Sequence, residues 1–276
     1  MTFFFRLLSH CPLWFLHALG AGMGWLAYGL SPSYRRRLRQ HSAMAGVDNG
    51  ARRAAIGQAG KLVAELPRLW MGQPVPARWT GDAHIHAAFA RGRGLMFLTP
   101  HLGSFEAAAI AYAADFGQSL QPMTVLFRPP RKPWLRALVA AARTRPGLQS
   151  APTTAAGVRA MVRALQRGQC VAILPDQVPP QGLGMWTPFF GQDAYTMTLS
   201  VRLATQCDAT VLLAWGERLS WGRGFVVHVQ PLSGPLTGDT AADVALVNRD
   251  MEALIRRHPQ QYLWGYARYK QPRDEA

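Results

Sequence analysis

Short apolar runs recur along most of the chain beyond Gly94. They hold β-branched or aromatic residues and are bounded by glycine, proline or polar positions, which is typical of buried strands. The predicted strands are Leu95–Leu98, Met123–Phe127, Cys170–Leu174, Thr210–Trp215 and Phe225–Val229.

Longer stretches between these runs predict helices. The first, Arg52–Met71, carries an apolar stripe at helical spacing, with Pro67 marking a kink or an end. The others are Ala83–Ala90, Phe105–Phe116, Trp134–Ala142, Ala155–Gln166, Thr198–Thr205 and Ala241–Arg257. The alternation predicts an α/β fold with a central, largely parallel (mixed) sheet flanked by helices, in which the last two strands are the candidates for antiparallel pairing.

The N-terminal segment has a different pattern. It is mostly apolar and carries no charge from Cys11 to Leu30, a run roughly long enough as a helix to cross the hydrocarbon core. The basic run Arg35–Arg39 follows and predicts a cytoplasmic position for the rest of the chain. We therefore expect an N-terminal hydrophobic anchor helix within a membrane-anchor segment, residues 1–33, and a functional domain over residues 34–276.

Two other interpretations of this segment stay open. Its closely spaced glycines, at positions 20, 22 and 24, and its aromatic residues also suit a helix that lies in the headgroup region. The same glycines suit a helix packed against the protein itself.

Composition narrows the class of protein. The 276 residues carry a formal net charge of +15, which favours a negatively charged partner such as nucleic acid, anionic lipid or an acidic protein. The three cysteines are widely separated and form no C-x-x-C pair, which argues against a disulfide framework or a zinc site and for a reducing compartment.

Candidate catalytic residues lie where the first strand of the predicted alternation gives way to a helix. His101 lies in this loop, and Glu106 follows in the first helical turn after Ser104, a favourable N-cap. Ligands of open α/β sheets bind beyond the carboxyl ends of strands, so His101 is placed to act as a base with Glu106 as its partner. The alternative is a hydrogen-bonded loop histidine beside an ordinary first-turn acid.

Three further polar residues are candidates for substrate binding. Asp176 follows the strand Cys170–Leu174, and it faces the same crevice as His101 if the two strands are neighbours. Arg128 follows the strand Met123–Phe127, and Arg143 ends the next helix. Arginines at these positions suit a phosphorylated substrate or a developing oxyanion. The alternatives are a turn residue for Asp176 and a position on a solvated helix face for either arginine.

The aromatic segment Trp186–Gly191 suits either an acyl-chain groove or core packing. No G-x-S-x-G, G-x-x-x-x-G-K-[ST] or H-E-x-x-H motif is present, which argues against the hydrolase, kinase and zincin classes.

Taken in order, these segments resemble a known family, the late acyltransferases of lipid A synthesis within the lysophospholipid acyltransferase-like superfamily. The resemblance is carried by the apolar N-terminus, H-x4-E at His101, Arg128-Pro-Pro, Pro-Asp176-Gln, Thr-Pro-Phe-Phe-Gly191 and the tail, which includes Pro259-Gln-Gln-Tyr-Leu-Trp264 and Arg268-Tyr-Lys270. It runs to about Lys270, nearly the whole chain.

The resemblance implies a glycerol-3-phosphate acyltransferase-like fold and transfer of a fatty acyl group from acyl carrier protein to a hydroxyl of a lipid A precursor. It implies an anionic inner membrane as the site of action, with the domain on the cytoplasmic side, and no cofactor, metal or nucleic acid. By position, His101 would be the base and Glu106 its partner, with Arg143 and Asp176 in support.

Two alternatives remain beside this expectation. One is an acyltransferase of the same fold with another lipid acceptor, such as a glycerolipid, an ornithine-type lipid or an aryl polyene. The other is a basic membrane-binding protein without enzymatic activity.

Overall fold

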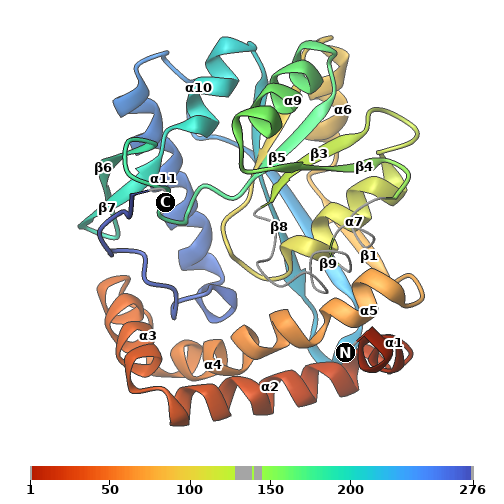
Figure 1. Ribbon diagram of the computed structural model, residues 1–276, viewed down its shortest axis with the longest axis vertical. Helices are drawn as coiled ribbons and strands as arrows, with labels where there is room; N and C mark the ends of the chain where they lie inside the picture. The colour runs from red at the N-terminus through yellow and green to blue at the C-terminus, as the bar shows by residue number, and fades with distance from the viewer. Residues whose placement is uncertain (1, 128–138, 140–144, 275–276) are drawn as a thin grey trace.

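A computed structural model describes residues 2–127, 139 and 145–274. Its centre is a mixed sheet with strand order β1-β9-β8-β2-β5-β3-β4 (Figure 1). All neighbours in this sheet pair in parallel except β8 and β9, which are antiparallel, as expected for the last two strands. The strands are β1 (Ala77–Thr80), β2 (Leu95–Leu98), β3 (Met123–Phe127), β4 (Leu148–Pro152), β5 (Cys170–Ile173), β8 (Thr210–Arg218) and β9 (Phe225–Pro231).

Helices bury both faces of this sheet. Alternate residues of β2 point to opposite sides: Met96 and Leu98 join one apolar cluster, Leu95 and Phe97 another. The first cluster contains residues of α9 (Ala155–Gln166), α10 (Leu199–Gln206) and α11 (Thr240–Arg257), and the second contains residues of α6 (Ala83–Ala90) and α7 (Phe105–Asp115). Burial on both faces explains why the central strands are continuous apolar runs in the sequence.

The bounds of most predicted elements are confirmed within a residue or two. The break expected near Pro67 lies at Glu65, between α4 (Asn49–Ala64) and α5 (Leu66–Met71). The helix expected at Trp134–Ala142 falls almost wholly outside the described residues. Strands β1 and β4 were not predicted. The aromatic segment lies in a hairpin of β6 (Gly184–Phe189) and β7 (Gln192–Met197), and Phe189 and Phe190 are buried in the core.

The expected N-terminal anchor helix requires correction. Pro12 divides the apolar segment into α1 (Thr2–Ser9) and α2 (Leu13–Leu30), because proline starts a helix readily but cannot continue one. Among the residues described, we find no helix with the length and hydropathy that a bilayer span requires. The basic run lies in a further helix, α3 (Pro32–Met44), and the division of the chain at residue 33 stays a prediction.

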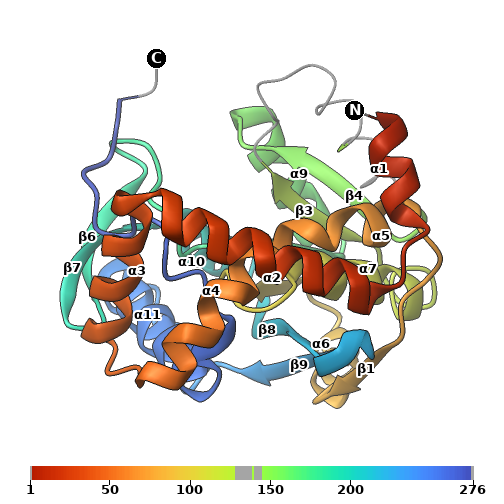
Figure 2. The same ribbon diagram turned by 90° about the horizontal axis from the view of Figure 1, so that it is seen from below.

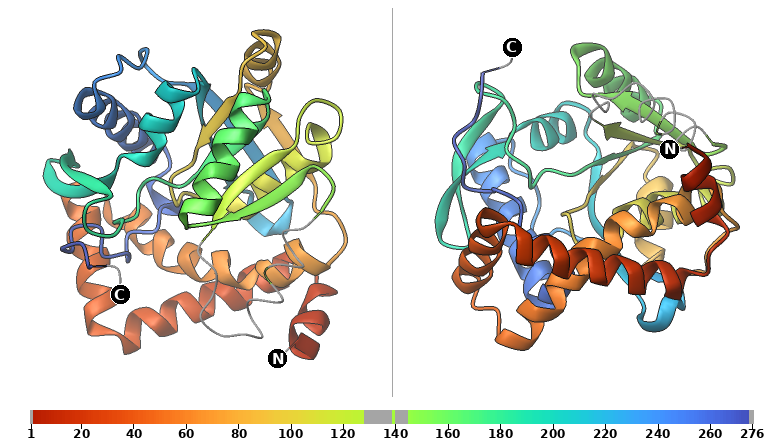
Figure 3. Two further views of the ribbon diagram at one scale, coloured as in Figure 1. Left: turned by 45° about the horizontal axis from the view of Figure 1, so that its top comes forward. Right: turned by 60° about the horizontal axis from the view of Figure 1, so that its bottom comes forward.

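Close contact between α2 and α4 explains the glycines of the N-terminal segment. The two helices run side by side in both views of Figure 3. A Cβ on Gly24 would lie 2.2 Å from the carbonyl oxygen of Ile56, and one on Gly60 would lie 1.9 Å from that of Gly20. Only glycine allows the backbones to approach this closely. One side of α2 is thus packed against the protein, as one of the open interpretations proposed.

Candidate active site

Strand register places His101 and Asp176 together. β2 and β5 are parallel neighbours in which Leu98 pairs with Ile173, and each polar residue lies three positions beyond its strand. Both therefore emerge at the same edge of the sheet, where the carboxyl ends of parallel strands form a crevice. The structure thus places Asp176 beside His101, as expected for neighbouring strands, and its role in substrate binding stays a prediction.

Two hydrogen bonds join His101 to Asp176. The ring Nδ1 lies 2.6 Å from Asp176 Oδ1, and the backbone N–H of His101 donates to Oδ2 at 2.8 Å. A carboxylate only accepts, so Nδ1 carries a hydrogen, and in the neutral ring Nε2 is then the acceptor. The side-chain nitrogen of Gln177 lies 3.0 Å from Nε2 and donates to it. The imidazole is thus held in the tautomer that a general base requires.

The environment of Asp176 keeps it ionised. Burial raises the pKa of this carboxyl, but attraction to the imidazolium form of His101 and the hydrogen bonds from the His101 ring and backbone N–H outweigh burial and hold the pKa below its usual value. The hydroxyl of Tyr262 donates to Oδ2 at 3.2 Å. Burial and the neighbouring carboxylate raise the pKa of Tyr262 well above its usual value, so it remains a donor.

Glu106 lies in the first turn of α7, a helix whose N-cap is the hydroxyl of Ser104. Its side chain is 5% exposed and accepts a hydrogen bond of 3.1 Å from Trp70 Nε1. Among the described residues, the partner of His101 Nδ1 is Asp176. The expected pairing of Glu106 with the ring stays a prediction, although both side chains line one cavity.

This cavity has a volume of about 1150 Å³. His101, Glu106 and Gln177 lie on its wall, and Arg159 and Arg202, both exposed, lie at its solvent side. The remaining lining is largely apolar and includes Phe97, Met123, Val125, Leu148, Ala172 and Leu199. A cavity at or above the upper end of the usual range for ligand sites, apolar with a few convergent polar groups, suits a long apolar substrate.

Sequence reasoning found part of this site. Arg128 and Arg143 lie outside the described residues. Gln177 and Tyr262 were not predicted as site residues, although both lie in segments on which the family resemblance rests. Trp70 could not be predicted, because nothing in its amphipathic helix distinguishes it from a residue that only packs.

Fold and site together define an α/β protein in which a histidine on the wall of a largely apolar cavity is paired with a buried aspartate. Comparison with known proteins agrees with this description. The family "Bacterial lipid A biosynthesis acyltransferase" matches residues 2–271. The chain belongs to this family.

Individual relatives are more distant. The "Lipid A biosynthesis lauroyltransferase" of Escherichia coli K12 is 27% identical over 199 residues, which are 70% of this chain and 63% of the relative. The "Lipid A biosynthesis palmitoleoyltransferase" of the same organism is 25% identical over 191 residues, 69% of this chain and 60% of the relative. The "Lipid A biosynthesis acyltransferase" of Haemophilus influenzae is 22% identical, over 68% of this chain and 57% of the relative. The chain thus spans about three fifths of the length of these relatives.

Proposed function

We propose that this protein is a membrane-associated O-acyltransferase with a fold of the glycerol-3-phosphate acyltransferase type. It transfers a fatty acyl chain from acyl carrier protein to a hydroxyl of a lipid A precursor. The observation that carries the proposal is His101, whose Nδ1 is tied to Asp176 while Nε2 lies at a large, mostly apolar cavity. Family membership supports the reaction type.

In the proposed mechanism, Nε2 of His101 exchanges the amide of Gln177 for the acceptor hydroxyl and removes its proton. The hydroxyl oxygen attacks the thioester carbonyl carbon, and the tetrahedral intermediate then expels the carrier thiolate, which takes the proton from the imidazolium. Asp176 fixes the tautomer and stabilises the imidazolium. Glu106, on the same cavity wall, is the second carboxyl group that supports the imidazolium.

The cavity and its arginines support the substrate class. The apolar lining suits the acyl chain, whose burial is favourable at roughly 0.8 kcal/mol per CH₂ group. Arg159 and Arg202 provide guanidinium groups at the solvent side, where a phosphorylated acceptor can be bound in bidentate geometry. The net charge of +15 is complementary both to such an acceptor and to an acidic carrier protein.

The outer side of the N-terminal helices supports membrane association. Figure 2 shows α2 running across one side of the molecule, with α1 beyond its first residue. Large apolar side chains that are 41% to 82% exposed line these two helices: Phe3, Phe4, Leu7, Trp14, Phe15, Leu19, Met23, Trp25, Leu26 and Leu30. Exposed Arg6, Arg36 and Arg39 lie in or next to them. Apolar and basic groups so combined suit an anionic membrane surface, which we propose is the cytoplasmic side of the inner membrane.

The direct test is a transfer assay with purified protein, an acyl carrier protein loaded with defined acyl chains, and a lipid A precursor. We expect mass spectrometry to show the acceptor gaining one acyl group, with release of the carrier thiol. Parallel reactions with a lysoglycerolipid and an ornithine-type lipid separate the proposed acceptor from others. Transfer to one of these alone would replace the acceptor, and no transfer to any would refute the proposed function.

A further inference from the structure

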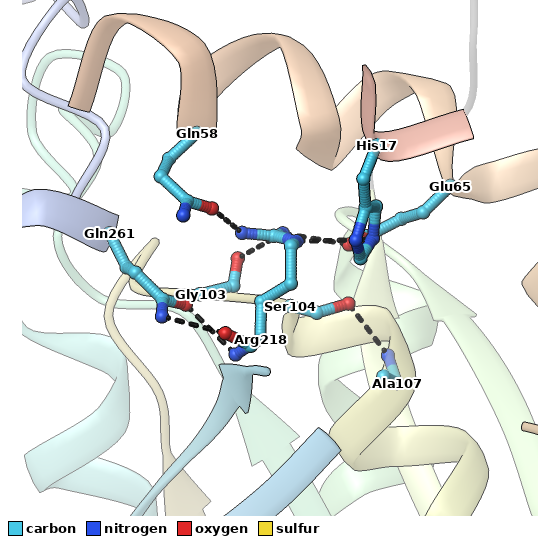
Figure 4. Close-up of polar contacts among 8 residues, drawn as sticks. All are labelled: His17, Gln58, Glu65, Gly103, Ser104, Ala107, Arg218 and Gln261. Atoms are coloured by element: carbon cyan, nitrogen blue, oxygen red, sulfur yellow. Dashed lines mark hydrogen bonds and ion pairs between the residues drawn. The ribbon is translucent and has the colours of Figure 1, made fainter. Parts of the chain in front are cut away.

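A buried polar cluster lies behind the loop that carries His101. Its centre is Arg218, the last residue of β8, whose Nε and Nη2 donate to Glu65 Oε2 and Oε1 at 2.6 and 2.8 Å (Figure 4). Nη1 donates to Gln58 Oε1 at 2.8 Å, and His17 Nε2 lies 3.0 Å from Glu65 Oε2. Arg218 is 4% exposed and Glu65 is fully buried. The proposed chemistry uses none of these residues.

The cluster reaches the catalytic loop directly. Nη2 of Arg218 also donates to the carbonyl oxygen of Gly103 at 3.2 Å, two residues from His101. The side chain of Gln261 is hydrogen-bonded to both backbone groups of Arg218, and the backbone carbonyl oxygen of Gln261 accepts from Gly103 N–H at 3.0 Å. Gly103 is therefore held at its carbonyl oxygen by the Arg218 side chain and at its N–H by Gln261, whose side chain is bonded to the Arg218 backbone.

Gly103 itself leaves little freedom for adjustment. Its φ of +62° lies in the left-handed region, and a Cβ there would lie 2.0 Å from the carbonyl oxygen of Gly216. The N–H of Ser104 donates to that same oxygen at 2.7 Å. A shift of this backbone would move His101 and the start of α7, which carries Glu106.

Stability alone is a weak reason to bury this ion pair. The desolvation cost of two buried charges is large enough that an apolar pair of similar volume is often as stable or more so. The planar guanidinium of arginine instead holds its N–H donors in fixed directions, a fork that here binds the carboxylate of Glu65 and the carbonyl oxygen of Gly103 together.

We propose that Arg218, held by Glu65, is a positioning residue for His101: it fixes the loop at Gly103 so that the imidazole keeps its place between Asp176 and the cavity. The consequence for catalysis rests on the function proposed above, whereas the consequence for the loop does not. Loss of the fork releases the loop and lowers turnover without removing any group that touches substrate.

The test uses the double variant Glu65→Gln/Arg218→Met, which removes both buried charges, together with Arg218→Lys, which keeps the charge but loses the fork. Arg257→Met is the matched control, because Arg257 is exposed on α11 and bonded to Gln230. Each full-length protein is measured for melting temperature, for kcat and KM in acyl transfer, and for hydrogen exchange at the amides of His101, Gly103 and Ser104.

We expect the double variant to fold, to lose about 10²-fold in kcat with little change in KM, and to lose protection at the three amides, because small displacements of a catalytic group cost this much. Arg218→Lys should show the same pattern and decides the matter if the double variant does not fold. Either folded variant with wild-type kcat and wild-type exchange overturns the proposal. If the wild type transfers no acyl group, the proposed function fails, and hydrogen exchange at the three amides alone decides whether Arg218 fixes the loop at Gly103.

Discussion

At the scale of single residues, the carboxylate that bonds the imidazole of His101 gives the first prediction. Asp176 bonds the ring Nδ1, whereas Glu106 accepts from Trp70. Replacement of Asp176 by asparagine should lower kcat by about 10² to 10⁴, since the tautomer is no longer fixed. Replacement of Glu106 by glutamine should lower kcat less, because it leaves the hydrogen bond between Asp176 and His101 Nδ1 in place. Initial rates of both variants at saturating donor would check the order, and a larger loss for Glu106→Gln would restore Glu106 as the ring partner.

A second prediction concerns the pH dependence of stability. Burial raises the pKa of Glu65, but the charge of and hydrogen bonds from Arg218 outweigh it and lower the pKa from 4.5 to about 2. A depressed folded-state pKa stabilises the protein above the unfolded value, and this contribution is lost as pH falls from about 4.5 toward 2. Denaturant unfolding across this window should show a steeper loss of stability in the wild type than in Glu65→Gln. Equal slopes would show that this carboxylate is not held in ionised form.

Single residues also show what sequence reasoning could reach. His101 and Asp176 were predicted because each directly follows a strand, where parallel topology brings polar groups together. The pairing of Glu65 with Arg218 could not be predicted, because the two are 153 positions apart and lie in no motif.

At the scale of elements, the approach of α2 to α4 makes a testable demand. Gly24 and Gly22 lie in the same helix, but a Cβ on Gly24 would meet the backbone of α4, whereas one on Gly22 would meet nothing within 4 Å. Gly24→Ala should destabilise the protein by about 1 to 3 kcal/mol through overpacking. Gly22→Ala should stabilise it by about 0.5 to 1 kcal/mol, because alanine favours the helix. Chemical denaturation compares the two, and similar stabilities would contradict the close packing.

Elements differ in how well the sequence predicts them. Central strands such as β2 and β5 were predicted because burial on both faces makes them continuous apolar runs. The edge strands β1 and β4 contain polar residues and gave no such run. The apolar run of α2 was predicted to be an anchor because the helix is apolar on all sides. One side is buried against α4 and another exposes apolar side chains, and the resulting sequence resembles that of a helix that spans a membrane.

At the scale of the whole molecule, the exposed apolar surface of α1 and α2 predicts binding to anionic vesicles. Trp25→Ser/Leu26→Ser should weaken binding by about tenfold or more, since two large apolar groups no longer enter the interface. Trp186→Ser, at a similarly exposed tryptophan on β6, is the control. Sedimentation with phosphatidylglycerol vesicles measures the effect, and added salt should reduce wild-type binding. Equal binding by the three proteins would rule out α2 as the contact.

The charge of the whole chain predicted a negatively charged partner but did not choose among nucleic acid, lipid and protein. The structure narrows the choice, because the candidate site is a cavity with an apolar lining and exposed arginines at its solvent side. Such a site suits a lipid with a charged headgroup.

The central claim is that His101 removes a proton from the acceptor hydroxyl. The most direct measurement is the kcat for acyl transfer by His101→Ala, with folding verified by its melting temperature. We expect kcat to fall by about 10²- to 10⁴-fold with the protein still folded. A folded His101→Ala protein that transfers acyl groups at the wild-type rate would contradict the proposed role of His101.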